Sequence, residues 1–276
     1  VDFILPSSKI LFGITTNLVP FLGSDQGNRV EMATRHMEQA ISLKAREQPL
    51  VQTATETGSS YEDHLGRFAS TRSRVAGTVQ AVGKDYIKIK DKDGKVTEHQ
   101  LYDNFPLNDA RTGIWSKPVV KKGDVVKKDE LLADTTYTKD GVLALGTNMR
   151  VGYLPYKGYN FEDGIVVSEE AAKKLTSEHL YKKGVTITKS VLMDLAKYRA
   201  YYPDRMSVDQ SEKLDEFGVV KVGSKLKPGD FLAAVLKEED VSKEARKLTK
   251  LNKSLVRPYA DRSTRWELPY AGEVVD

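Results

Sequence analysis

Residues 75–97 read VAGTVQAVGKDYIKIKDKDGKVT, and this stretch decides the fold class of the chain. Apolar residues alternate with other residues over 75–79 and again over 86–90, which is the period of two expected for a strand with one buried face. Asp93–Gly94 is a residue pair that tight hairpin turns favour. The stretch predicts a β-hairpin, in a chain that is mixed but built mainly from strands.

Two further passages have a similar pattern to each other. Residues 118–134 and 222–233 both read as strand, Gly-Asp turn, strand, with Gly123–Asp124 in the first and Gly229–Asp230 in the second. Glycine reaches positive φ without strain, and an aspartate side chain can bond to nearby backbone, so such turns close compact barrels and sandwiches. The likeness indicates a short internal repeat.

Helical spacing is clearest near the N-terminus. Asp25 is the predicted N-cap residue of this helix, and Pro49 is its predicted limit. Charged residues at helical spacing predict a second, surface helix over 238–255. The apolar residues of the first helix recur at the spacing of one helix face: Val30, Ala33, Met37, Ala40 and Ile41.

Composition limits the classes of function. The 276 residues include no cysteine, which excludes disulfides and thiolate metal sites. No apolar run approaches the length of a membrane span, so we expect no membrane segment. The net charge of +4, from 43 basic and 39 acidic residues, is weaker than a free-standing nucleic-acid-binding domain usually carries. Because Val1 is not a start methionine, we expect further residues upstream.

One aromatic-rich passage carries two adjacent carboxylates. In residues 151–164, VGYLPYKGYNFEDG, strand alternation predicts Tyr159 and Phe161 on one face and Asn160 and Glu162 on the other. The following Asp163–Gly164 then turns the chain. Two acidic groups on a rigid aromatic base could meet a hydrated metal ion. A solvated turn without function is the alternative.

The N-terminal helix carries a polar stripe. At about 100° per residue, Asn28, Arg35 and Gln39 fall close to one line along the helix. Arg29 lies in the first turn, where free backbone N–H groups and the helix dipole favour anions. The helix could therefore present an anion-binding end, and a solvated helix face is the alternative.

Several of these passages, taken in order, resemble the β subunit of bacterial-type multisubunit DNA-directed RNA polymerase. Residues 17–29, NLVPFLGSDQGNR, are similar to the family pattern NLIPFLxHDDxNR. Residues 158–169, GYNFEDGIVVSE, are similar to GYNFEDAIxxSE. Between them, residues 122–124, 131–134 and 143–151 continue the resemblance, which thus covers almost the whole chain.

The resemblance implies a fold and a division of the chain. Residues 1–74 would form a helix and fork-like loop segment. Residues 75–170 would contribute the β-hairpin and part of a double-psi β-barrel. Residues 171–276 would belong to the flap base, a sandwich-barrel hybrid.

The resemblance also implies residue roles. Glu162 and Asp163 would be catalytic residues near the nucleotide triphosphate, holding a second Mg²⁺ through its outer shell. Arg29 would contact nucleotide phosphates, and Gln39 would lie near the RNA 3′ end. Asn28 and Arg35 would complete the substrate-binding set.

The implied partners lie outside the chain. They are a β′-type large subunit with the main Mg²⁺ ligands, the remaining part of β, other polymerase subunits, DNA template, RNA and nucleoside triphosphates. The isolated chain would be inactive, and its location would be the cytoplasm of a bacterium or infected host.

This sequence departs from the family pattern on its helix. Glu38 stands where the family usually has a basic residue, and Arg35 stands where it has Asn. Residues 52–74 match weakly. Such drift suggests a divergent polymerase encoded by a large phage. The alternative class is a non-catalytic barrel or carrier-type binding module, in which Lys92 at the Asp93–Gly94 turn would be the modified lysine.

Overall fold

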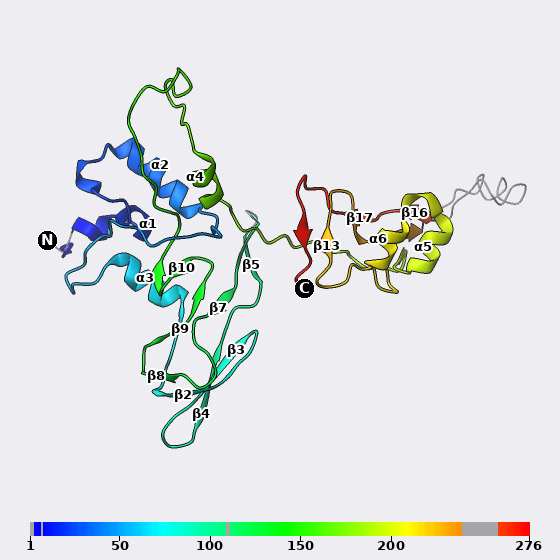
Figure 1. The fold of residues 1–276 in the computed structure, drawn as a ribbon, viewed down its shortest axis with the longest axis horizontal. Coiled ribbons are helices and arrows are strands. Elements are labelled where there is room, and N and C mark those ends of the chain that lie inside the picture. The colour runs from blue at the N-terminus through cyan, green and yellow to red at the C-terminus, as the bar shows by residue number, and fades with distance from the viewer. Residues whose placement is uncertain (1–2, 7, 109–110, 239–258) are drawn as a thin grey trace, which may run out of the picture. The chain divides into compact units, whose positions relative to one another are not determined.

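The structure, a computed structural model, describes residues 3–6, 8–108, 111–238 and 259–276. The chain divides into two compact units, Val1–Lys182 (unit 1) and Lys183–Asp276 (unit 2), each described here by itself (Figure 1). The fold is mixed and mainly β, as predicted, and the sheets formed by these residues are open. The segment boundaries predicted at 74 and 170 stay a prediction, because they refer to family domains rather than to compact units.

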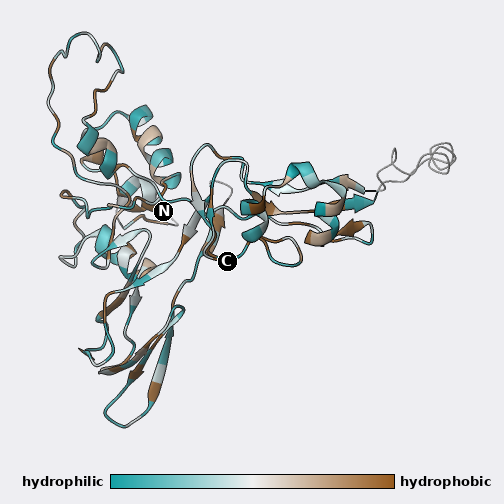
Figure 2. Ribbon diagram, turned by 45° about the vertical axis from the view of Figure 1, so that its right-hand side comes forward, coloured by the Kyte–Doolittle hydropathy of each residue, from teal (hydrophilic) through white to brown (hydrophobic). Residues whose placement is uncertain are grey.

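The predicted hairpin is present in unit 1. The Asp91 carboxylate fixes its turn by accepting the N–H groups of Asp93 and Lys95 at 3.0 and 2.9 Å, and Gly94 takes a φ of +82°. The hairpin belongs to an antiparallel sheet in the order β4-β3-β2-β8 (Figure 1), and the ribbon of this part of unit 1 alternates between hydrophobic and hydrophilic colours in Figure 2. Its strands are β2 (Gly77–Val82), β3 (Tyr86–Lys90), β4 (Val96–Gln100) and β8 (Val125–Val126).

The core of unit 1 lies under this sheet. Val79, Ile87 and Ile89 are at most 1% exposed, because alternate residues of β2 and β3 point to the same face. They pack against Val126 and Leu132. The other strands are β1 (Thr71–Arg72), β5 (Phe105–Asn108), β6 (Thr112–Ile114), β7 (Ser116–Pro118), β9 (Leu131–Thr135), β10 (Thr138–Lys139) and β11 (Val142–Leu143).

The helices of unit 1 precede and follow its strands. They are η1 (Ser8–Leu11), α1 (Ile14–Asn17), η2 (Leu22–Ser24), α2 (Gly27–Glu38), α3 (Tyr61–Ala69) and α4 (Glu169–Lys174).

The limits predicted for the first helix were wrong at both ends. Asp25 is not its N-cap, because the Asp25 N–H closes η2 on Leu22 and the helix begins after Gln26. The helix ends at Glu38 instead of continuing toward Pro49. Beyond it, Leu43 and Glu47 form isolated β-bridges with Ser177 and Gly146, and the chain turns between them at residues 44–45.

Unit 2 is organised around buried aromatic side chains. Tyr198 is fully buried, packs edge-on against Phe231 and donates its hydroxyl to Asp261 at 2.9 Å. The predicted helix over 238–255 lies outside the described residues except for Glu238, which is in a strand. The elements of unit 2 are β12 (Val191–Leu192), α5 (Leu195–Tyr201), η3 (Pro203–Arg205), α6 (Val208–Glu212), β13 (Lys225–Leu226), β14 (Phe231–Ala233), β15 (Leu236–Glu238), β16 (Tyr259–Asp261), β17 (Thr264–Arg265) and β18 (Gly272–Glu273).

The two passages form a structural repeat, although not in the alignment that the sequence indicated. The strand–turn–strand unit β8–β9 recurs as β13–β14 at an offset of 100 residues, so Gly123 corresponds to Gly223 and Asp129 to Gly229. All four of these residues have positive φ. The Gly-Asp dipeptides that seemed equivalent in the sequence therefore occupy different positions of the repeat.

The strands that pair with these units are repeated as well. β8 and β9 pair with β2 and β1, and β13 and β14 pair with β18 and β17 in the same registers. The partner strands β1 and β2 precede their unit in the sequence, whereas β17 and β18 follow theirs. The matching pairs are Gly77–Val126 with Gly272–Leu226, Thr78–Val125 with Glu273–Lys225, Thr71–Ala133 with Thr264–Ala233, and Arg72–Leu131 with Arg265–Phe231.

A buried histidine makes unit 1 sensitive to acid. His99 is 2% exposed, and its Nε2 accepts the Arg74 N–H at 2.9 Å. Burial, followed by the nearby Arg74 charge, lowers the pKa of His99. The unfolded chain therefore takes up this proton at a higher pH than the folded chain, and folding loses stability as the pH falls below about 6.5.

We predict that His99→Gln flattens this pH dependence. One proton changes the free energy of unfolding by at most about 1.4 kcal/mol per pH unit, and the variant removes that contribution below about pH 6.5. Urea unfolding of both proteins at each pH measures the difference. Parallel stability curves would show that His99 titrates as an ordinary histidine.

Candidate functional site

The predicted acidic motif lies in a long exposed loop between Asn148 and α4, which extends away from the helices of unit 1 in Figure 1. The predicted strand over Tyr159–Glu162 was wrong. The Asn160 side chain accepts the Tyr156 N–H at 2.8 Å and donates to the Leu154 carbonyl at 2.6 Å. The backbone therefore forms consecutive turns, and the alternation of faces does not apply.

Glu162 and Asp163 occupy the second of these turns. The Gly164 N–H donates to the Phe161 carbonyl at 3.0 Å and closes the turn. Glu162 takes a φ of +53°, a strained backbone conformation for a non-glycine residue. Both acidic residues are exposed, and neither forms an ion pair within the described part of the chain. The two carboxylates are available to a ligand from solvent.

Large apolar side chains surround this turn and are also exposed. Tyr153 is 97% exposed and Phe161 is 78% exposed. Exposed large apolar residues in one loop favour an interaction site, because water solvates them poorly. The other exposed apolar residues of the loop are Val151, Leu154, Tyr156, Tyr159, Ile165, Val166 and Val167.

The two ends of the loop are held together by residues 42–48. The Glu47 carboxylate accepts hydrogen bonds from the Asn148 N–H at 3.0 Å and the Asn148 side chain at 3.1 Å. Its other oxygen bonds to the Lys174 ammonium at 2.9 Å. Asn148 precedes the loop and Lys174 ends α4 behind it, so Glu47 clamps the base of the loop.

Strong hydrogen bonding keeps the Glu47 carboxylate of this clamp ionised. The bond from Lys174, followed by those from Asn148, lowers the pKa of the Glu47 carboxyl to about 2. Backbone bonds support the clamp, with the Glu47 N–H on the Gly146 carbonyl and the Lys44 N–H on the Thr176 carbonyl, both at 2.9 Å. The loop that presents the acidic turn is thus anchored, although its own residues are exposed.

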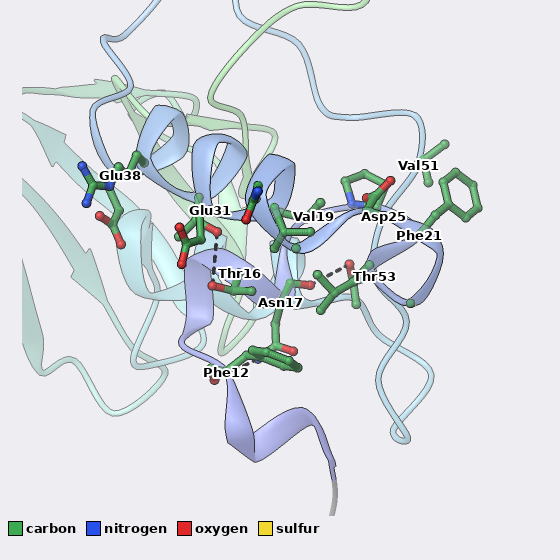
Figure 3. Close-up of a pocket in the computed structure, with 18 of the residues that line it drawn as sticks. Phe12, Thr16, Asn17, Val19, Phe21, Asp25, Glu31, Glu38, Val51 and Thr53 are labelled. Carbon is green, nitrogen blue, oxygen red and sulfur yellow. Dashed lines mark hydrogen bonds between the residues drawn. The ribbon is translucent and has the colours of Figure 1, made fainter.

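The predicted substrate-binding residues of α2 divide into two groups. Asn28 and Arg35 line a pocket of about 1150 Å³ between α1, η2, α2 and residues 51–53 (Figure 3). Arg29 is exposed outside this pocket, with its guanidinium 3.5 Å from the Met32 sulfur. Gln39 follows the last helical residue and does not line the pocket either. The helix therefore presents these side chains in more than one direction.

The pocket wall is acidic. Asp25, Glu31 and Glu38 line it, with Arg35 as its basic residue. The Glu38 carboxylate accepts the Thr15 hydroxyl at 3.1 Å. Such a wall repels a triphosphate, and Arg29 lies outside it whereas Arg35 lies within it.

Sequence reasoning did not predict this pocket. Its apolar wall comes from residues on either side of α2 in the sequence, including Phe12, Val19, Phe21 and Val51. Residues 10–12 and 18–22 are mostly apolar in the sequence. Nothing local to them indicated that Val51 and its neighbours would close the space.

Metal ligands do not cluster within the described residues. No group of three or more Asp, Glu or His side chains gathers there in a geometry that could hold an ion. Glu162 and Asp163 provide two adjacent carboxylates without a third ligand. Two adjacent carboxylates are too few to coordinate Mg²⁺ by themselves.

Comparison with known proteins defines the class of this chain. Residues 72–276 match the family described as RNA polymerase Rpb2, domain 6. The chain therefore belongs to this polymerase family. Among the helices of the described residues, none has the length and apolar character of a membrane span.

Within this class, the chain is similar to the DNA-directed RNA polymerase subunit beta of several bacteria. Identity is 31% with that of Mycoplasmopsis synoviae (strain 53), over 100% of this chain and 23% of the relative. It is 33% with that of Thermus aquaticus, over 96% of this chain and 24% of the relative. The chain thus spans about a quarter of the length of these relatives.

Family membership leaves no role for a carrier domain. Lys92, the candidate modified lysine of that alternative, lies in the β3–β4 turn between Asp91 and Asp93. These acidic neighbours replace the hydrophobic ones that a carrier hairpin needs. We therefore interpret the turn as a structural one.

We predict that Glu47→Gln loosens the base of the loop. The protection of the Asn148 amide against hydrogen exchange should fall, because the amide loses a charged acceptor. In the native chain the clamp is intact above about pH 4.5 and is lost as the pH falls toward 2, since ionised Glu47 is the bonded form.

Glu170→Gln is the matched control. Glu170 pairs with Lys173 at 2.8 Å within α4 and does not touch Asn148. Exchange measured from pH 7 to 2.5, corrected for intrinsic rates, compares the three proteins. Equal protection of Asn148 in all of them at pH 7 would remove the assigned role of Glu47.

Proposed function

We propose that this chain contributes to the nucleotide-binding side of the active centre in a DNA-dependent RNA polymerase, as part of its β subunit. The observation that carries the proposal is the clamped, exposed loop with Glu162 and Asp163 at its turn, in a chain of the polymerase family. The exposed aromatic residues of the loop support a place inside a larger assembly, where other subunits cover them.

The reaction proposed for the assembly is nucleotidyl transfer, in which the RNA 3′ hydroxyl attacks the α-phosphate of a nucleoside triphosphate and pyrophosphate leaves. Magnesium, with its main ligands on a β′-type subunit, would supply charge stabilisation on the phosphates. Glu162 and Asp163 would orient water molecules around the second ion and hold negative charge beside it. Neither carboxylate forms an ion pair with the described residues, so both are free for this role.

The residues of α2 would bind the substrates. Arg29, exposed in the first turn of the helix, would form a charge-assisted hydrogen bond to a nucleotide phosphate. Gln39 would lie near the RNA 3′ end. Asn28 and Arg35 would act from the pocket wall, where Glu31 and Glu38 direct the contact toward sugar or base instead of phosphate.

The proposal extends to architecture and partners. Residues 75–170 would complete part of a double-psi β-barrel with other polypeptide, and residues 171–276 would form the sandwich-barrel hybrid of the flap base. The partners would be the β′-type subunit, the rest of β, other subunits, DNA, RNA and nucleoside triphosphates. A phage origin and a cytoplasmic location stay predictions.

We predict that Glu162→Ala together with Asp163→Ala slows nucleotide addition about tenfold and raises the magnesium requirement, because outer-shell support of an ion is lost. Assembly should be unaffected, since the two side chains are exposed. The elongation rate of the reconstituted polymerase is measured across a magnesium titration, with the chain alone as a blank.

The control removes another adjacent acidic pair, Glu169 and Glu170, by the same substitutions. These residues lie in the first turn of α4 and have no proposed contact with the ion. Their loss should leave the titration unchanged. Overlapping curves for the native and Glu162/Asp163 variants would reduce the motif to a solvated turn.

We predict that Arg29→Ala raises the apparent KM for nucleoside triphosphates roughly tenfold to hundredfold, the effect of losing a charge-assisted bond of about 1.5 to 3 kcal/mol. Arg29→Lys keeps the charge and should recover part of this loss. Steady-state RNA synthesis and promoter binding are measured in parallel. A normal KM with impaired promoter binding would assign Arg29 to DNA instead.

A further inference from the structure

β18 of unit 2 occupies the position that β2 has in unit 1. β2 is paired on both edges, with β8 on one side and β3 on the other. β18 pairs with β13, the equivalent of β8, and within the described residues it has no second neighbour. Among the described residues, unit 1 therefore has β3, followed by β4, at an edge where unit 2 has no paired strand.

Backbone hydrogen bonds show which edge is open. The Val79 N–H donates to the Asp124 carbonyl and the Gly123 N–H donates to the Val79 carbonyl, both at 2.8 Å. In unit 2, Val274 makes the same two bonds with Ser224 and Gly223, at 3.0 and 2.8 Å. Because alternate residues of a strand direct their backbone groups to opposite edges, Glu273 and Val275 direct theirs away from β13.

Side-chain burial shows the same difference. Val79 is 1% exposed, since Ile87 and Ile89 of β3 pack against it. Its equivalent Val274 is half-buried, and the adjacent Val275 is 38% exposed. Unit 2 therefore has a sheet edge whose apolar side chains lack the cover that β3 provides in unit 1.

A tryptophan occupies the first position of this edge. Gly77 lies against the Lys90 backbone of β3, whereas Gly272 lies against the ring of Trp266. Trp266 thus covers the start of β18 and leaves Glu273–Asp276 as the open length. This length corresponds to the part of β2 that pairs with β3.

The charges along β18 place a further requirement on the strand that would pair with it. In unit 1, Thr78 pairs with Lys90 and Ala81 pairs with Lys88. The equivalent positions in unit 2 are Glu273 and Asp276, both acidic. A strand in the same register would place residues opposite two carboxylates, where lysines are favoured.

We propose that the outer edge of β18 is a docking site for one added antiparallel β-strand. The occupant is an extended segment from polypeptide outside these 276 residues, with alternating branched aliphatic and basic side chains, the chemistry of Tyr86–Lys90. The backbone groups of Glu273 and Val275 pair with it, and its aliphatic side chains cover Val274. The interaction is strand addition to an exposed edge.

The test uses the 276-residue chain and a synthetic peptide, DYIKIKD, with the sequence of Asp85–Asp91. Nuclear magnetic resonance follows hydrogen exchange of the Val275 amide as the peptide is added to millimolar concentration. Exchange of this amide should slow about tenfold, because its N–H gains a carbonyl acceptor. A peptide with both isoleucines replaced by asparagine should have no effect.

Two variants separate edge pairing from other binding. Val275→Pro removes the outward N–H and leaves the bonds of Val274 to β13 in place, so it should abolish peptide binding. Val275→Ala keeps the N–H and should retain binding. Because the proline variant has no amide at position 275, exchange of the Glu273 amide reports peptide binding in both variants. Unchanged exchange of Val275 in the native chain with peptide, or equal slowing of the Glu273 amide in the proline variant, would overturn the proposal. So would concentration-dependent dimerisation without peptide that Val275→Pro abolishes, since a second copy would then be the occupant.

Discussion

In each repeated strand–turn–strand unit, the turn is fixed by a carboxylate that accepts the backbone N–H of the residue three positions before it. Both units depend on this bond. Glu130 accepts the Lys127 N–H at 2.7 Å, and Asp230 accepts the Lys227 N–H at 2.9 Å. The flanking strands have two to five residues, too few to define a register by ladder bonds alone. In unit 2, burial opposes ionisation of Asp230, but hydrogen bonds from Lys213 and Lys227 hold its pKa below the usual value.

The parts of the fold that the sequence predicted are those with local causes. The β3–β4 hairpin follows from alternation and from an aspartate that bonds its own turn, all within a few residues. The repeated strand–turn–strand passages were visible for the same reason. Their pairings with other strands were not, because β1 and β2 lie before one passage and β17 and β18 lie after the other. The two strands of each such pair lie too far apart in the sequence for a local pattern to include both.

The candidate site shows the same division between local and distant causes. Alternation suggested a strand at Tyr159–Glu162, but one side-chain amide, Asn160, bonds across the backbone and forms turns instead. Gly164 reinforces them, because a Cβ there would lie 2.8 Å from the Tyr159 carbonyl oxygen. The alanine of the resembling family pattern would not fit without a shift. Glu47, which anchors the loop, lies about a hundred residues before it, and its role required the structure.

The order of the repeated elements has a consequence for synthesis on the ribosome. In unit 1 the strands β1 and β2 leave the exit tunnel first, so β8 and β9 meet these partners as soon as they emerge. In unit 2 the strands β13 and β14 emerge before β17 and β18 exist, so the edges that pair with β17 and β18 stay open until the last residues of the motif are made. Nascent chains with unpaired edges are prone to mispairing and chaperone capture. Unit 2 is therefore the part of the chain whose maturation depends on the pace of translation.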